Sequence, residues 1–589
     1  MFPKYSVIKT TNKWSSCSFP VTLERTITRL TMDNKRRGQG SGIVANLTDR
    51  GKPQRTTYKL STSKPLPDNT NCMACSDDGG FLTLGHSSGV SVWCVHTMRS
   101  MADWLQEETE VTSIKMTNVC EAFYMVGSVD NMGVMRIFLY HGKDLFLVSV
   151  LNSMQNINKR NVCLTFELFK GGDYGAASVR CMSDTWLEVY RFPSEDWIRE
   201  FEAAAARKEE ESESFVPETL KWSPVSVELK IFPPKIPPVR ADDATKIITF
   251  CLSLDELDEG LRTCTHHFLL PCGSCPADVH VKSGLPAAVC MWWSGSHNLL
   301  QYFFHKSDQT TAVDLKPDIT WPHTNEITCS AVSRCFRFVA VGLSNAVVCV
   351  WDRLAGSPLS VSSIPTQTSL LRVQFVDYWP VCADDYQSTT LDENHLMALC
   401  KNGAIFSITV GRGAKSITTE LPDKPQNKGD MPTITESVQF LRGLLLVWHR
   451  DGKILLEDVI HNTPLCALLR PASHHIASPC TPVYALNAKQ HSLYIRGDPH
   501  QRRGCSAKKE NHSVLLTFHF GESHVIKHYI ASHPPSPPRM KKLSFEDLKE
   551  DFSFYLQERV LSVDERHAAI KHTWEHLQQR RENAAAPHK

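Results

Sequence analysis

Pairs of short apolar strands that flank a tight turn recur along this 589-residue chain, and they constrain its fold more than any other feature. In the clearest pair, "FVAVG" and "VVCVW" lie on either side of "LSNA", between Phe338 and Trp351. β-Branched runs joined by a turn that contains Asn are typical of an antiparallel hairpin. The turns at Asn402-Gly403 and Asp451-Gly452 carry the dipeptides that most strongly favour a two-residue hairpin. The sequence therefore predicts a chain built mainly from β-hairpins.

The hairpin turns recur at an interval that indicates a repeat. Seven of them are centred at Ser88, Asn131, Asp184, Gly295, Asn345, Asn402 and Asp451. Their spacing is close to even, except across one wide gap between Asp184 and Gly295, which has room for one further unit and an insertion. An eighth pair of runs, "HSLYIR" and "HSVLLTFHF", follows the last turn. Because propeller blades repeat at about 40 to 50 residues, the pattern predicts an all-β, WD-repeat-like β-propeller of about seven or eight blades in one ring.

The predicted blades depart from strong WD repeats. Trp351-Asp352 is the only complete closing pair at a blade position, and Ser88, Asn345 and Asn402 stand where the central turn of a strong repeat carries Asp. We therefore expect the polar network of strong repeats to be largely absent, and the blades to be held mainly by apolar packing between neighbouring sheets. These residues are interpreted as turns and core, and not as catalytic groups.

Composition separates the propeller from the segments around it. Residues 1–65 are polar and basic and are predicted to form a flexible arm, although one strand within it could join the last blade and close the ring. Residues 66–200 and 244–532 are predicted to hold the first and second parts of the propeller. Residues 201–243 form an acidic and proline-rich insertion, with one short helix expected at Ala203–Arg207.

The remaining part, residues 533–589, combines a proline hinge with a helical pattern. Ser544 and Ser562 are each followed three residues later by an acidic residue, as in the capping boxes that open helices. Apolar side chains at helical spacing then form one stripe on each predicted helix. The stripes consist of Phe545, Leu548, Phe552 and Tyr555, and of Ile570, Trp574 and Leu577. Either the helices pack on the propeller rim, or these seven candidate partner-binding residues dock into a groove of a partner.

Charge and motifs disfavour several classes of protein. The 64 basic and 63 acidic residues nearly cancel, which removes a general attraction to nucleic acid or membrane surfaces. The chain has no signal-peptide pattern and no apolar run near the ~18 residues of a membrane span, so a cytosolic location with reduced cysteines is expected. P-loop, GxSxG and GxGxxG motifs do not occur. Two CxxC pairs, Cys72–Cys75 and Cys272–Cys275, are weak metal or redox candidates. We expect no enzyme activity, no cofactor and no metal.

The blades and the tail together resemble a known family. Met73–Val95 and Ile327–Gly356 look like degenerate WD-repeat blades, and their combination with a helical tail resembles the WD repeat-containing protein 93 family over residues 68–589. The resemblance implies a non-catalytic scaffold in the axoneme of motile cilia and flagella, within a projection of the central apparatus. It also implies a hetero-complex with other cilia- and flagella-associated proteins. The alternatives are a substrate receptor or adaptor of a ubiquitin-ligase or trafficking complex, and an accessory of an electron-transfer complex.

Overall fold

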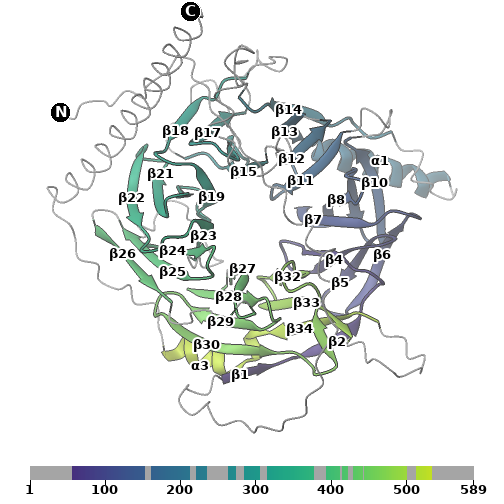
Figure 1. Ribbon diagram of the computed structural model, residues 1–589. Helices are drawn as coiled ribbons and strands as arrows, with labels where there is room; N and C mark the ends of the chain where they lie inside the picture. Colours follow the sequence, from purple (N-terminus) through teal and green to yellow (C-terminus); the bar gives the residue numbers. More distant parts are fainter. Residues whose placement is uncertain are drawn as a thin grey trace, which may run out of the picture.

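The computed structural model describes residues 56–532 except for 153–160, 183, 212–220, 235–262, 273–283, 305–314, 377–392, 412–413, 422–426, 428, 439, 442 and 500–511. These residues form an eight-bladed β-propeller in a single ring (Figure 1). This architecture confirms the predicted all-β, WD-repeat-like fold. The predicted helical tail at 533–589 and the arm up to residue 55 lie outside the described residues.

Each blade is a sheet whose first strand faces the axis of the ring and whose last strand lies outside (Figure 1). Blade 1 consists of β3 (Cys72–Cys75), β4 (Phe81–His86), β5 (Gly89–Cys94) and β6 (Arg99–Leu105). Blade 2 consists of β7 (Val111–Cys120), β8 (Phe123–Asp130), β9 (Met135–His141) and β10 (Asp144–Val150). Blade 3 consists of β11 (Val162–Leu168), β12 (Tyr174–Cys181), β13 (Asp184–Arg191) and β14 (Ser226–Ile231). Blade 4 consists of β15 (Cys264–Leu269), β16 (Ala288–Trp293), β17 (Asn298–Phe303) and β18 (Ile319–Pro322).

The second half of the chain repeats this plan. Blade 5 consists of β19 (Ile327–Val332), β20 (Phe338–Leu343), β21 (Val347–Asp352) and β22 (Ser357–Ser363). Blade 6 consists of β23 (Leu370–Phe375), β24 (Glu393–Cys400), β25 (Ile405–Gly411) and β26 (Ala414–Glu420). Blade 7 consists of β27 (Pro432–Ser437), β28 (Leu444–His449), β29 (Ile454–Asp458) and β30 (Thr463–Leu469). Blade 8 contains β31 (His474–Ile476), β32 (Tyr484–Asn487), β33 (Ser492–Pro499) and β34 (Val514–His519).

The predicted hairpin turns lie where the second strand of a blade meets the third. This holds for all seven turns, and the eighth pair of runs forms β33 and β34. The wide gap between Asp184 and Gly295 does not contain a further unit within the described part of the chain. Blades 3 and 4 pack directly against each other, with Tyr174, Leu187 and Phe304 in one buried cluster. The wide gap instead holds the outer strand of blade 3 and the inner strand of blade 4.

The ring is closed by two strands from the segment that was predicted to be a flexible arm. β2 (Thr62–Pro65) pairs antiparallel with β34 and forms the outer strand of blade 8. β1 (Thr56–Lys59) pairs parallel with β30 and adds a fifth strand to blade 7. Tyr58, which lies on β1, stacks its ring on the ring of Phe520, with the ring centroids 6.2 Å apart. The predicted boundary at residue 65 is therefore too late, because these strands gain backbone pairs and ring packing only once blades 7 and 8 exist.

The insertion predicted at 201–243 also differs from the structure. Helix α1 spans Ser194–Glu211, so it begins earlier and is longer than the helix expected at Ala203–Arg207. Acidic residues in its first turn favour a helix start there. Trp197 anchors it, since this buried indole donates a hydrogen bond to the carbonyl oxygen of Ser223 at 2.7 Å. β14 follows and completes blade 3, so this segment contains part of the propeller as well as an insertion.

The described chain ends at two short helical elements beside blades 7 and 8. The 3-10 turn η4 (Phe520–Glu522) follows β34, and helix α3 (His524–Ser532) follows η4. Phe520 and Ile526 are both buried in the apolar cluster that joins these two blades. The predicted second part of the propeller therefore ends with a helix rather than with a strand.

Apolar packing between blades holds the ring together, as the degenerate repeats predicted. Each of the eight seams between neighbouring blades contains a cluster of buried apolar side chains. A polar remnant survives in blade 1, where His86 Nε2 and Ser91 Oγ form a hydrogen bond of 2.9 Å. The indole N–H groups of Trp93 and Trp351 are buried without a hydrogen-bond partner in the part of the chain that the structure describes. The network of strong WD repeats is thus largely lost.

Candidate interaction site at the ring axis

The structure does not test the partner-binding residues that the sequence predicted. Phe545, Leu548, Phe552, Tyr555, Ile570, Trp574 and Leu577 all lie outside the described residues. Their stripes remain a prediction from the spacing of the sequence. The candidate site that the structure itself offers lies elsewhere, among the inner strands of the propeller.

Of the two CxxC pairs, only Cys72–Cys75 is described in full. Cys72 and Cys75 lie on β3, and burial raises the pKa of each thiol to about 12, which keeps both protonated at neutral pH. Cys272 is described but Cys275 is not. Within the described residues, no group of three or more His, Cys, Asp or Glu side chains is placed to hold a metal ion. The helices of the described ranges are also too short or too polar to span a membrane.

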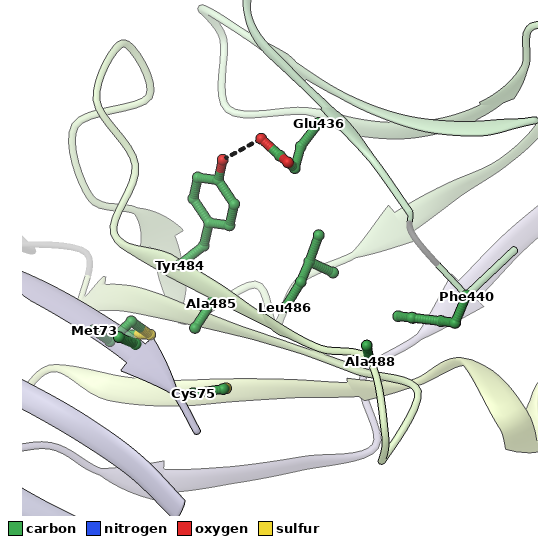
Figure 2. A pocket seen from close by; sticks show the side chains of 9 residues that line it. Met73, Cys75, Glu436, Phe440, Tyr484, Ala485, Leu486 and Ala488 are labelled. Atoms are coloured by element: carbon green, nitrogen blue, oxygen red, sulfur yellow. Dashed lines mark hydrogen bonds between the residues drawn. The ribbon is translucent and has the colours of Figure 1, made fainter. Parts of the chain in front are cut away.

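A pocket of about 300 Å³ opens beside the inner strands of blades 7, 8 and 1, and we call it the axial pocket (Figure 2). It is lined by Met73, Ala74, Cys75, Glu436, Phe440, Tyr484, Ala485, Leu486 and Ala488. β3 supplies one wall, β32 and the residue after it supply another, and β27 with the turn that follows it supplies the third. Figure 2 shows Glu436 and the Tyr484 hydroxyl together in one part of the pocket, away from Phe440 and Ala488.

Small side chains explain why the pocket exists. Ala485 and Ala488 line the pocket from blade 8, at positions where larger side chains would reduce its volume. The seam behind them is well packed, because Leu82, Tyr494 and Leu515 are almost completely buried there. The pocket is therefore a local lack of side-chain volume on a tightly packed wall.

A single carboxylate organises the polar part of the pocket. Glu436 Oε2 accepts a hydrogen bond from the Tyr484 hydroxyl at 3.2 Å and pairs with Arg372 Nη2 at 3.1 Å. Gln374 Nε2 donates to Glu436 Oε1 at 3.5 Å. Burial raises the pKa of Tyr484 far above its usual range, and the negative charge of Glu436 is the second cause of this shift. The phenol therefore stays protonated and acts as a donor. The carboxylate thus links blades 6, 7 and 8 at the axis.

A second cavity, of about 500 Å³, lies where α1 leaves blade 3 and where Leu285 approaches from blade 4. Its polar groups largely satisfy one another. Ser194 Oγ donates to Asp173 Oδ1 at 2.7 Å, and Arg199 pairs with Asp196. Its lining combines these polar contacts with apolar side chains that include Tyr174, Phe192 and Leu285.

Sequence reasoning missed the axial pocket because its residues come from both ends of the propeller. Met73 lies in the first blade and Ala488 in the last, and they meet only because the ring closes. No local motif marks an absence of side-chain volume. The one available signal is the run "YALNA" at Tyr484–Ala488, an inner strand with unusually small side chains.

The fold defines the class of protein: eight sheets around one axis, with strands in WD-repeat order, form a WD40-type β-propeller. A model of the family described as WD repeat-containing protein 93 matches residues 70–250 and 244–348. Over these residues the chain matches the WD repeat-containing protein 93 family, which confirms the resemblance of the sequence. Fold and family together support a protein-interaction scaffold.

Several solved propellers are similar to this chain at low identity. Sqt1 from Chaetomium thermophilum is 12% identical, with 80% of this chain and 98% of that chain covered at a TM-score of 0.45. Sqt1 from Saccharomyces cerevisiae is 10% identical, with 79% and 98% covered at a TM-score of 0.42. The C-terminal WD40 domain of Sif2 is 10% identical, with 78% and 99% covered at a TM-score of 0.40. At these TM-scores the likenesses carry no information about partners.

Proposed function

We propose that this protein is a non-catalytic scaffold in the axoneme of motile cilia or flagella, within a projection of the central apparatus. The observation that carries the proposal is the match to the WD repeat-containing protein 93 family over residues 70–348. The architecture supports a holding role, because loops on both faces of a rigid disc vary without disturbing the packed seams. Its place would then be in the cytoskeleton of the cilium, in a hetero-complex with other cilia- and flagella-associated proteins.

Fractionation of motile cilia tests the cellular place of the protein. Full-length tagged protein is expressed in multiciliated cells, and the cilia are isolated and extracted with detergent. The proposal predicts that the protein stays with the detergent-insoluble axonemes. If it is recovered only in the cytosol, the axonemal assignment fails, and the adaptor role in a ubiquitin-ligase or trafficking complex becomes the leading function.

The C-terminal stripes give a second prediction, which can be tested independently of axonemal retention. Replacing Leu548 and Phe552 with Ala removes two large apolar groups from the predicted docking stripe, and we expect at least one co-purifying partner to be lost more than tenfold. The control variant replaces Glu550 and Gln557 with Ala on the opposite face of the same predicted helix. Quantitative mass spectrometry of the purified complexes measures the effect. Equal partner recovery from both variants would show that the stripe does not bind partners.

A further inference from the structure

We propose that the axial pocket binds a partner segment that inserts one apolar side chain, of leucine to phenylalanine size, and directs a lysine or arginine toward Glu436. This inference rests on the proposed scaffold function and adds to it the chemistry of one partner contact. It draws on the shape of the pocket, on its charge and on the rigidity of its walls.

The shape of the pocket fits one side chain. Met73, Phe440 and Leu486 provide apolar walls around a volume of about 300 Å³, and the alanines leave its floor unfilled. Protein interiors are close-packed, and apolar surface that stays in contact with water forgoes a favourable burial of about 25 cal/mol for each Å². A leucine, methionine or phenylalanine side chain would bury these walls together with its own surface.

The charge of the pocket selects the neighbour of that side chain. Among the described lining residues, Glu436 is the only one with a charged side chain. A carboxylate offers about four acceptor positions, and the protein supplies three donors to it, from Arg372, Gln374 and Tyr484. The remaining position can accept an N–H from an incoming lysine or arginine. An acidic side chain has no N–H to donate to this position, and it would add a second negative charge to a carboxylate that Arg372 already neutralises.

The walls of the pocket are fixed before any partner arrives. The Phe440 ring stacks on His491 with a centroid distance of 4.8 Å, and on its other side it contacts Phe520 at 5.7 Å. Tyr484 packs on Trp448 at 4.5 Å and is also held by its hydrogen bond to Glu436. A pocket with ordered walls loses little conformational entropy on binding, which favours a short linear segment as the ligand.

The chain's own C-terminal segment is the rival occupant. Phe520 touches the pocket wall at Phe440, and the chain then continues through α3 into the segment 533–589. That segment carries aromatic residues and lysines, as a partner segment would. The experiment must therefore separate a partner in trans from this segment.

The test exposes purified full-length protein to a display library of random short peptides. We expect the enriched peptides to share one large apolar residue next to lysine or arginine. Ala488→Leu fills the pocket and should weaken these peptides at least tenfold. Glu436→Gln should weaken them about fivefold. Ala203→Leu, the same substitution on the exposed surface of α1, should leave their binding unchanged.

Melting curves first establish that each variant folds. The binding results then distinguish a partner segment from the chain's own C-terminal segment as the occupant of the pocket. Peptides that bind the Ala488→Leu variant as tightly as the natural protein would overturn the site, and so would an enrichment of acidic peptides or no enrichment at all. A synthetic peptide of residues 541–583 is then added as a competitor. If it displaces the library peptides, the pocket belongs to the chain's own tail, and the partner proposal fails. Peptide binding is measured in solution, so its failure is distinct from a failure of axonemal retention.

Discussion

At the scale of single residues, Asp352 is the strongest polar remnant of the WD repeat. Its side chain is only 3% exposed, and it pairs with the guanidinium of Arg337 through Nε at 3.0 Å and Nη2 at 2.7 Å. It also accepts hydrogen bonds from the amides of Leu354 and Ala355. Burial alone would raise the pKa of Asp352, but the hydrogen bonds and the charge of Arg337 outweigh it and hold the pKa below its usual value.

Asp352→Asn should lower the free energy of unfolding by about 2 kcal/mol, because it removes charge-assisted hydrogen bonds that the fold has already desolvated. The pKa of this carboxyl is depressed in the fold, so its contribution is present above the unfolded pKa of about 3.9 and is lost as the pH falls further. Urea denaturation at several pH values measures both effects. Asp144→Asn, on the exposed start of β10, is the control and should change little.

Three glycines occupy equivalent positions in the second strands of their blades, and each allows close packing against the next blade. Gly85, Gly127 and Gly342 end the runs "LTLG", "YMVG" and "VAVG" in the second strands of blades 1, 2 and 5. A Cβ on Gly85 would lie 2.5 Å from Cys72 Sγ and 2.6 Å from Val111 Cγ1 of the next blade. The missing side chain lets a first-strand residue of the neighbouring blade approach closely.

Gly342→Val should therefore destabilise the seam between blades 5 and 6. Its Cβ would lie 2.5 Å from Cys329 Sγ and 3.1 Å from Leu370 Cδ1. Overpacking of this kind costs about 1 to 3 kcal/mol, which thermal melting of the purified protein would detect. Gly521→Val is the control, because nothing lies within 4 Å of a Cβ there and its φ is not positive. A loss at Gly521 as large as that at Gly342 would contradict the packing argument.

At the scale of elements, β1 and β2 act as a clasp across blades 7 and 8. The Ser61 amide donates to the Thr517 carbonyl oxygen at 2.9 Å, and the Leu66 amide donates to the Ser513 carbonyl oxygen at 2.9 Å. The Tyr58 hydroxyl donates to the His519 carbonyl oxygen on the same blade. Without these strands, blade 8 would lose its outer strand and both blades would expose an apolar edge.

A chain that starts at residue 67 should therefore melt several degrees lower than one that starts at residue 56. Its blades 7 and 8 should also be cleaved first in limited proteolysis, because local opening begins where buried contacts are fewest. Deletion of residues 1–55 alone retains both strands and serves as the matched control. Identical melting temperatures for the two truncations would mean that the clasp does not hold the ring closed.

The clasp also marks the limit of what the sequence predicts about elements. Central hairpins were predictable because turn dipeptides and β-branched runs are local signals. β1, β2 and β14 are short outer strands, and they become strands only when a neighbouring sheet edge offers backbone partners. The sequences of β1 and β2 are polar, so nothing local separates them from loop. β14 alternates Val227, Leu229 and Ile231 with polar residues, but it lies inside the segment that was interpreted as an insertion. The boundaries at 65 and 201–243 failed for this reason.

At the scale of the whole molecule, the interval between turns predicted one ring, but the seams define its size. Eight apolar clusters, each shared by two blades, make the propeller a continuous core around the axis. The candidate site is less predictable from the sequence than the fold is. The axial pocket depends on closure between residues at opposite ends of the chain, so no local pattern encodes it. The predicted tail stripes rest on helical spacing in the sequence alone, and they lie outside the described residues.

The central claim is that this ring holds axonemal partners without catalysing a reaction. Cross-linking mass spectrometry of detergent-extracted axonemes tests it most directly, because it reports which proteins touch which part of the propeller in place. We expect cross-links from the blades and from the C-terminal segment to other axonemal proteins, at more than one face of the ring. Recovery of intact axonemes that contain the protein but yield only cross-links within its own chain would contradict the scaffold.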